Sequence, residues 1–375
     1  MKKHHYLVTF LYILLFLSTL NLLKIFLSPS YIDFKYYYLA LQTFIHGGNP
    51  YARSFFAFPY PPVALLFILP FSYLPLLIAG KIFVFISFIA LILSISLLLR
   101  LFKVSLLSPL GMVVFILAFN FFPTKFSLAS GQLNTIVLLL TCGFLYSFKM
   151  KRNYFAGMLL AMATALKLYP FLVIPYLLIQ KKWKMLIALI ATYLILSIIV
   201  LVFIPLPIIS TYFSKILPQY LHVGGGGGYY DQSFSAFIAR TFSKTNAALI
   251  SHFVGGLIII ITILLTLYKR SKVSPLLIIC LILIFNVIFS NFAWQHHFIW
   301  LLMPLIIVLL KGLKSNINLS FYIFLGISYL LLAINFKNPS TIPVLLQSHE
   351  LYGALLLYIL TLYIIIYSAK SKTNT

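Results

Sequence analysis

Apolar stretches of about 20 residues, separated by short polar segments, recur along the whole sequence. A stretch of this length lets an α-helix cross the hydrocarbon core of a bilayer, whereas soluble helices and strands mix apolar and polar positions more finely. The pattern predicts spans at 6–28, 76–99, 109–123, 132–148, two short arms within 154–180, 185–206, 248–268, 274–291, 297–311, 318–336 and 351–369. We therefore expect an all-α polytopic membrane protein with about twelve transmembrane helices, forming a single integral membrane domain over residues 1–375.

The composition supports this fold class. Hydrophobic residues make up 63% of the chain and charged residues only 8%, compared with about 25% charged residues in soluble domains. A soluble enzyme, a disordered chain and a fibrous protein are all excluded. The apolar run that follows Lys2-Lys3 is too long for a signal peptide and lacks a small-residue cleavage site, so we interpret it as a retained first span. Cys142 and Cys280 lie inside apolar runs, with no spacing typical of a disulfide framework or a metal site.

The charge pattern predicts the topology. The chain has 27 Lys and Arg residues and three acids, which gives a formal net charge of +24. The basic residues cluster between the spans, as cytoplasmic loops require, and this makes nucleic-acid binding an unnecessary explanation. With both chain ends in the cytoplasm, several polar segments share the extracytoplasmic face: 33–61, 124–134, 167–170, 229–233 and 291–297. We expect a multi-pass protein of the cell membrane with its active site on that side.

The first outer loop, residues 29–75, contains the first candidate chemistry. Apolar residues follow Asp33 at helical spacing until Gly47-Gly48, which predicts an amphipathic helix in the membrane interface. A second short helix is expected over 62–74, after a proline-rich segment. Asp33 has two interpretations that can coexist. It is the N-cap of the first helix, or it is a general base at the membrane surface.

Other outer segments also have competing interpretations. Lys167, at the tip of a hairpin, either extends its amine toward water or contacts an anionic phosphate. The segment 131–134 is either a capped helix end or part of a site. The segment 207–247 is interpreted as a flexible outer loop, in which five consecutive glycines, 224–228, act as a hinge or as a plain linker. Trp294 suits an aromatic belt, and because neighbours on a helix point about 100° apart, one of the adjacent histidines that follow is expected to face a site.

Taken in order, these motifs resemble glycosyltransferase family 87. The resemblance covers roughly residues 30–305. The motifs are Asp33 with Tyr36-Tyr37, Gly48-Asn49-Pro50-Tyr51, Phe58-Pro59-Tyr60-Pro61-Pro62, Phe71 to Pro75, Gly131-Gln132-Leu133-Asn134, Gly157 with Lys167 and Pro170, Asp231-Gln232-Ser233, and Trp294 with His296-His297.

The resemblance implies a GT-C fold and an inverting transfer of a hexose, mainly mannose in this family, from a polyprenyl-phosphate sugar to a glycolipid or glycan hydroxyl. It assigns Asp33 to the acceptor hydroxyl and makes His296 and His297 catalytic candidates. The family commonly has Asn where this chain has Asp231, which leaves the role of that motif open.

The chemistry of these residues supports the same reaction independently of the family resemblance. Displacing a lipid phosphate requires a base for the incoming hydroxyl and positive charge for the departing phosphate. Asp33 supplies the first, while Lys167 and Arg53, with one of the histidines, supply the second. The remaining motif residues are interpreted as substrate-binding: Tyr36, Tyr37, Tyr60, Gln132, Asn134, Asp231, Gln232 and Trp294. No paired carboxylates occur, so we expect no metal and no cofactor.

Two alternatives remain at this stage. A polysaccharide polymerase or ligase also uses lipid-linked sugars, but it is expected to depend on Arg and His in a large outer loop. A lipid-linked sugar flippase or transporter would place polar residues along a path at mid-membrane depth. The ionisable residues of this chain gather at span ends, which favours the transferase.

Overall fold

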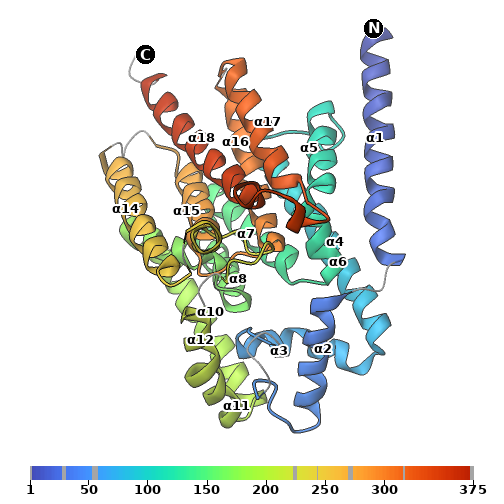
Figure 1. Ribbon diagram of the computed structural model, residues 1–375, viewed down its shortest axis with the longest axis vertical. Helices are drawn as coiled ribbons and strands as arrows, with labels where there is room; N and C mark the ends of the chain where they lie inside the picture. Colours follow the sequence, from blue (N-terminus) through green and yellow to red (C-terminus); the bar gives the residue numbers. More distant parts are fainter. Residues whose placement is uncertain are drawn as a thin grey trace. The chain divides into compact units, whose positions relative to one another are not determined.

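The computed structural model describes residues 2–27, 31–52, 58–222, 226–242, 244–268, 273–315 and 317–371. Within these ranges every regular element is a helix, and one isolated β-bridge joins Asp231 to Trp294 (Figure 1). The predicted all-α class is therefore confirmed. The α-helices are α1 (Lys2–Leu27), α2 (Ile32–Ile45), α3 (Pro62–Ile68), α4 (Leu76–Leu101), α5 (Pro109–Asn120), α6 (Phe122–Ser130), α7 (Asn134–Lys149), α8 (Asn153–Leu166), α9 (Val173–Ile179), α10 (Trp183–Phe203), α11 (Leu206–Thr211), α12 (Leu217–His222), α13 (Phe234–Thr241), α14 (Ala247–Tyr268), α15 (Pro275–Phe289), α16 (Leu302–Lys314), α17 (Leu319–Ala333) and α18 (His349–Ser371).

Short 3-10 and π-helical segments connect several of these helices. The 3-10 segments are η2 (Leu69–Tyr73), η3 (Tyr169–Leu172), η5 (Gln295–Leu301), η6 (Pro339–Thr341) and η7 (Val344–Ser348), and η4 (Tyr212–Ile216) is a π-helix. The chain divides into two compact units. The first comprises residues 1–120 and 124–223, and the second comprises 121–123 and 224–375.

Each predicted span corresponds to an apolar helix, but the helices differ in length. Among the described residues, six helices are long and apolar enough to cross a membrane, and the bent pair α5 and α6 makes up to seven. The other predicted spans are helices of 10–17 residues, including both arms of the predicted hairpin, α8 and η3 with α9. A continuous hydrophobic run in the sequence does not show where a proline or glycine shortens the helix.

In the first unit, α2 and α3 lie at the end opposite to the N-terminal end of α1 (Figure 1). Both helices were predicted, the first between Asp33 and Gly47-Gly48 and the second over 62–74, and both form, with η2 completing the second. The buried residues of α2 include Phe34, Tyr37 and Leu41, whereas Lys35 is exposed, so the helix is amphipathic as expected.

The segment 207–247 contains more helix than its interpretation as a flexible loop implies. Pro205 and Ser233 precede α11 and α13, and the Ser233 hydroxyl caps α13 by accepting a hydrogen bond from the Ala236 backbone N–H at 3.1 Å. Proline and a capping serine are local signals that start helices even within a polar connection. The glycine run falls partly outside the described residues, which exclude 223–225.

Helices α8 and α10 pack unusually closely within the first unit. A Cβ atom added to Gly157 would lie 2.1 Å from the backbone oxygen of Met185. Only a residue without a side chain allows this approach. Gly157, which the resemblance includes among its motif residues, therefore has a packing role.

Candidate active site

The first turn of α2 positions Asp33. The N-cap of this helix is Tyr31, and no side-chain cap hydrogen bond is made there. Asp33 is the second residue of the helix, where a carboxylate interacts favourably with the positive end of the helix dipole. The interpretation of Asp33 as the N-cap is therefore wrong. The side chain, which is half-buried, is directed to other partners.

A glycine turn brings the second group of polar residues to Asp33. Gly131 ends α6 with a positive φ of 68°, and a Cβ atom there would lie 2.6 Å from the Cβ of Phe34. The turn therefore packs directly on the first turn of α2. The residues on either side of the glycine, Ser130 and Gln132, both hydrogen-bond to the Asp33 carboxyl group.

The orientation of the Gln132 amide is fixed from the opposite side. Its Oε1 atom accepts hydrogen bonds from the Tyr37 hydroxyl at 2.7 Å and from the Tyr60 hydroxyl at 3.1 Å. The two hydroxyl groups lie 2.6 Å apart. Because the amide oxygen is occupied by these donors, the Nε2 group is the one that donates to Asp33. Tyr37 and Tyr60 thus act on the carboxyl group through Gln132.

Lys167 completes this cluster from the break between α8 and η3. Its side chain is buried, at 7% exposure, and its Nζ atom donates to Asn134 Oδ1 at 2.7 Å. The Asn134 amide donates in turn to Ser127 Oγ at 3.2 Å. The ammonium group also lies 5.4 Å from the centre of the Tyr60 ring, within the range of a cation–π interaction.

Burial changes the pKa of both ionisable groups. It raises the pKa of Asp33 above its ordinary value, while the hydrogen bond from Gln132, the charge of Lys167 and the hydrogen bond from Ser130 act in the opposite direction. Burial lowers the pKa of Lys167 to about 7, and the charge of Asp33 opposes that change. The two groups therefore act on one another: each shifts the pKa of the other against the effect of burial.

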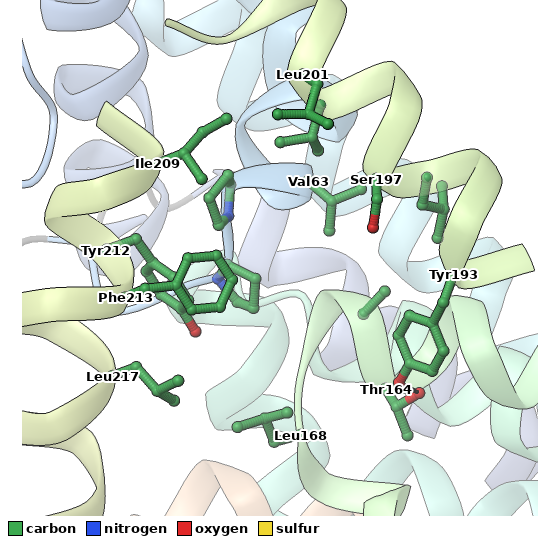
Figure 2. Close-up of a pocket in the computed structure, with 15 residues that line it drawn as sticks. Val63, Thr164, Leu168, Tyr193, Ser197, Leu201, Ile209, Tyr212, Phe213 and Leu217 are labelled. Atoms are coloured by element: carbon green, nitrogen blue, oxygen red, sulfur yellow. Dashed lines mark hydrogen bonds between the residues drawn. The ribbon is translucent and has the colours of Figure 1, made fainter. Parts of the chain in front are cut away.

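An apolar cavity adjoins the cluster. It has a volume of about 370 Å³ and is bounded by α3, α8, α10 and the helices of 206–217. Pro61 and Leu168 line it, and they directly follow Tyr60 and Lys167 in the chain. Figure 2 shows Val63, Leu168 and Leu201 around this space. Its lining is predominantly apolar, so it suits a hydrocarbon chain.

Of two further residues expected at the site, only Tyr36 is among the described residues. Tyr36 lies on the outward face of α2 with 47% of its side chain exposed. Arg53 lies outside the described residues. Conversely, sequence reasoning missed Ser127 and Ser130, whose only signal is their position just before the Gly131 motif on α6.

In the second unit, the motif at 231–233 connects three segments of backbone. Asp231 Oδ1 accepts hydrogen bonds from the backbone N–H groups of Ser233 and Ala293, at 3.0 and 2.9 Å. Gln232 donates from its side chain to the carbonyls of Tyr229 and Gln347, both at 2.7 Å. Burial raises the pKa of Asp231, against the hydrogen bonds that favour its ionised form. An asparagine oxygen would accept the same two hydrogen bonds, so the departure from the family pattern preserves this geometry.

Arg240 also supports this motif and was not anticipated from the sequence. Its guanidinium group donates to the carbonyls of Gly228 and Asp231, both at 2.7 Å, and to Ser348 Oγ at 2.7 Å. Nothing in the sequence pairs an arginine of α13 with these partners.

The histidine pair is buried in the same unit. His296 and His297 are 3% and 8% exposed, and their rings meet edge to face with centroids 4.5 Å apart. His297 Nδ1 accepts a hydrogen bond from the Trp294 backbone N–H at 3.2 Å, which caps η5, and its ring stacks on Trp300 at 5.2 Å. His297 therefore has a structural role. The Trp294 side chain, in contrast to the two histidines, is partly accessible, with 37% of the residue exposed.

Comparison with known proteins gives a family match. The sequence model of glycosyltransferase family 87 matches residues 58–291. An α-(1→3)-arabinofuranosyltransferase of Mycobacterium tuberculosis is 28% identical over 198 residues, covering 50% of this chain and 45% of the relative. The chain therefore spans less than half the length of that relative.

Two further similarities are found, one to a protein sequence and one to a solved structure. A polyprenol-phosphate-mannose-dependent α-(1-2)-phosphatidylinositol mannoside mannosyltransferase of Mycobacterium tuberculosis is 22% identical over 313 residues, covering 77% of this chain and 72% of the relative. The crystal structure of ArnT from Cupriavidus metallidurans bound to undecaprenyl phosphate aligns with 95% of this chain and 77% of its own, at 13% identity and a TM-score of 0.44.

Proposed function

Because the chain belongs to glycosyltransferase family 87, we propose that it transfers a hexose, mannose, from a polyprenyl-phosphate sugar to a hydroxyl group of a glycolipid or glycan. The observation that carries this proposal is the cluster in which Asp33 and Lys167 interact electrostatically around Gln132. A carboxylate and a buried ammonium group are the two charges that the reaction needs.

Asp33 is proposed as the general base. The acceptor oxygen attacks C1 of the sugar, and its proton passes to the Asp33 carboxylate as the new bond forms. The bond between C1 and the phosphate oxygen breaks on the opposite side of the ring, so the anomeric configuration inverts. The Gln132 amide holds the carboxylate in position, because Tyr37 and Tyr60 fix its orientation.

Lys167 is proposed to bind the donor phosphate. Negative charge accumulates on that phosphate as the sugar leaves, and a preorganised ammonium group in a buried site stabilises it strongly. Asn134 and the Tyr60 ring hold the Lys167 amine before the donor arrives. The apolar cavity beside Leu168 accommodates the first part of the polyprenyl chain.

Within the second unit, we propose that His296 and the exposed part of Trp294 bind substrate, on the strength of the family resemblance. Asp231 and Gln232 support this segment, since their described hydrogen bonds are to backbone groups. We propose no metal and no cofactor. The names of the relatives give two sugars, arabinofuranose and mannose, so both donors are included in the test.

The test is a transfer assay with purified full-length protein. Polyprenyl-phosphate mannose and polyprenyl-phosphate arabinofuranose would be offered with a panel of membrane glycolipids, and products read by mass spectrometry and by NMR for the anomeric configuration. We expect transfer of mannose with inversion. Transfer of arabinofuranose alone would replace the sugar but keep the mechanism. Absence of transfer from every polyprenyl-phosphate sugar, together with transport of a lipid-linked sugar in vesicles, would favour the flippase alternative.

The proposed extracytoplasmic position of the site has its own test. Single cysteines would replace Lys35 on α2 and Arg152 at the start of α8, both exposed. The native Cys142 and Cys280 are buried, and so serve as an unlabelled background. An impermeant thiol reagent should label position 35 in intact cells and position 152 only after the membrane is opened. The reverse result would place the site on the cytoplasmic side.

A further inference from the structure

Three helices of the first unit end with a lysine in an unusual backbone conformation. Lys103, Lys151 and Lys181 follow α4, α7 and α9 with positive φ angles of 60°, 58° and 53°. This left-handed region is one that glycine adopts with less strain. Each helix thus closes with a cationic side chain where the backbone favours glycine. The negative end of a helix dipole accounts for a cation at these positions. It does not account for the cavity that Lys151 lines.

That cavity has a volume of about 540 Å³ and a strongly basic lining. Three of its residues are exposed cations, and exposed aromatic side chains stand beside them. The lining consists of Lys151, Arg152, Asn153, Tyr154, Phe155 and Lys184.

The close packing of α8 and α10 forms this cavity. The contact between Gly157 and Met185 brings the first turns of the two helices together, and α8 begins at Asn153 while α10 begins at Trp183. The cations at 151, 152 and 184 precede or open these two helices, so their positions follow from a tight backbone contact. The positive ends of the two helix dipoles add partial positive charge to the same place.

No acidic side chain of this protein lines the cavity. The whole sequence contains only three acids. Asp33 belongs to the cluster with Lys167, while Asp231 and Glu350 are buried, at 8% and 0% exposure. An anion that binds these cations therefore has to come from outside the chain.

We propose that this cavity binds the phosphate-bearing headgroup of an acidic membrane phospholipid. A lipid fits better than a soluble phosphate because an apolar surface starts at the same place. Trp183 is 56% exposed, and Ile187, Ile190 and Leu194 continue along the same face of α10 at 60%, 56% and 60% exposure. Basic residues at the helix ends, an interfacial tryptophan and an apolar stripe match the headgroup, boundary and acyl chains of one lipid.

The test compares lipids on the purified full-length protein. Binding of dioctanoyl phosphatidylglycerol would be measured from the rise in Tm with lipid concentration and by native mass spectrometry, with dioctanoyl phosphatidylcholine, glycerol 3-phosphate and inorganic phosphate as the other probes. We expect saturable binding of phosphatidylglycerol that weakens as salt is raised. Equal binding of phosphatidylcholine, or binding of glycerol 3-phosphate as tight as that of the lipid, would overturn the proposal.

A matched pair of double variants separates the cavity from diffuse surface charge. Lys151→Gln with Arg152→Gln removes two cations from the cavity. Arg100→Gln with Lys103→Gln removes the same two residue types, including a left-handed lysine, from the end of α4. The first pair should weaken phosphatidylglycerol binding by roughly 25-fold, and the second by less than about threefold. Equal losses from the two pairs would show that surface charge in general, and not this cavity, attracts the lipid, and would overturn the proposal.

Lys184→Gln is a second cavity variant, and it changes no lysine with a left-handed backbone. It should weaken phosphatidylglycerol binding roughly fivefold. An unchanged affinity would contradict the site.

Discussion

The Nζ atom of Lys167 donates a hydrogen bond to Asn134 Oδ1 over 2.7 Å, which ties the break after α8 to the first residue of α7. Lysine is rarely buried unless its charge is used or compensated. Here a neutral amide and the Tyr60 ring hold the amine, and the charge of Asp33 acts on it. An amine that is already oriented and largely desolvated is well prepared to bind a phosphate.

Replacing Lys167 by Met should impair use of the donor. The variant keeps the length of the side chain and removes its charge, and a charge-assisted contact to phosphate contributes about 1.5–3 kcal/mol, so kcat/KM for the lipid-phosphate donor should fall roughly ten- to a hundredfold. Lys24→Met is the control, because Lys24 is exposed near the end of α1. Similar, small effects of both variants in the transfer assay would show that Lys167 does not contact the phosphate.

The pH dependence of kcat/KM should report both ionisable groups of the free enzyme. Asp33 must be ionised, and burial raises its pKa, so activity should fall on the acid side at a pH above the ordinary aspartate range. Lys167 must be charged, and burial lowers its pKa to about 7, so activity should also fall as pH rises through about 7. In Lys167→Met the residual activity should lose the alkaline limb. An alkaline limb that persists in this variant would belong to another group.

The sequence identified most of this cluster but could not show how its members meet. Asp33, Lys167 and Gln132 were predicted from motif position and from the shared membrane face. The hydrogen bonds that orient Gln132 depend on hydroxyl groups 72 and 95 residues away in the chain, and no local pattern encodes such distances. The fold class and nearly every helix followed from hydrophobic runs, whereas the length of each helix depended on local proline, glycine and cap geometry.

In the second unit, the sequence pointed to the two histidines as candidates but did not predict what each contacts. The sequence alone cannot assign different roles to the adjacent residues His296 and His297. The structure shows that His297 caps η5 and stacks on Trp300. Arg240 carries no sequence signal at all, because its partners are mainly backbone carbonyls.

Gly131→Ala should disrupt the site through the backbone. The substitution combines a left-handed φ of 68° with a contact of 2.6 Å to Phe34, so it should push the turn away from α2 and separate Gln132 from Asp33. Gly47→Ala is a matched control, since Gly47 has a φ of 79° but nothing within 4 Å of a new Cβ atom. It should cost only the conformational strain of about 1–2 kcal/mol. Thermal unfolding and transfer assays on both variants measure the difference; equal losses would mean that the contact with Phe34 is unimportant.

The two histidines should respond differently to substitution. His297→Ala removes the acceptor that caps η5 and the stack on Trp300, so Tm should fall, as expected for a lost cap of about 1 kcal/mol together with lost packing. His296→Gln keeps a polar side chain of similar size and should lower kcat with little change in Tm if His296 acts on the substrate. Unchanged turnover in a stable His296→Gln protein would remove it from the mechanism.

Asp33→Asn tests the proposed mechanism most directly. The amide can still accept the hydrogen bond from Gln132, and because Asp33 is not the N-cap of α2, no cap is lost. The variant should therefore fold normally. It cannot take a proton from the acceptor hydroxyl, so kcat should fall by about 10²–10⁴-fold with little change in donor binding.

The other two acids of the chain provide the controls for this variant. Asp231→Asn keeps an oxygen for the two backbone N–H groups, so its effect should be small. Glu350→Gln should also be mild and should leave Tm unchanged or raise it, because neither carboxylate oxygen has a hydrogen-bond partner among the described residues and burying an uncompensated charge is costly. If Asp33→Asn turns over at the rate of these two controls in a monodisperse preparation, Asp33 is not the base, and the carboxyl group serves only to hold the turn at Gly131 against α2.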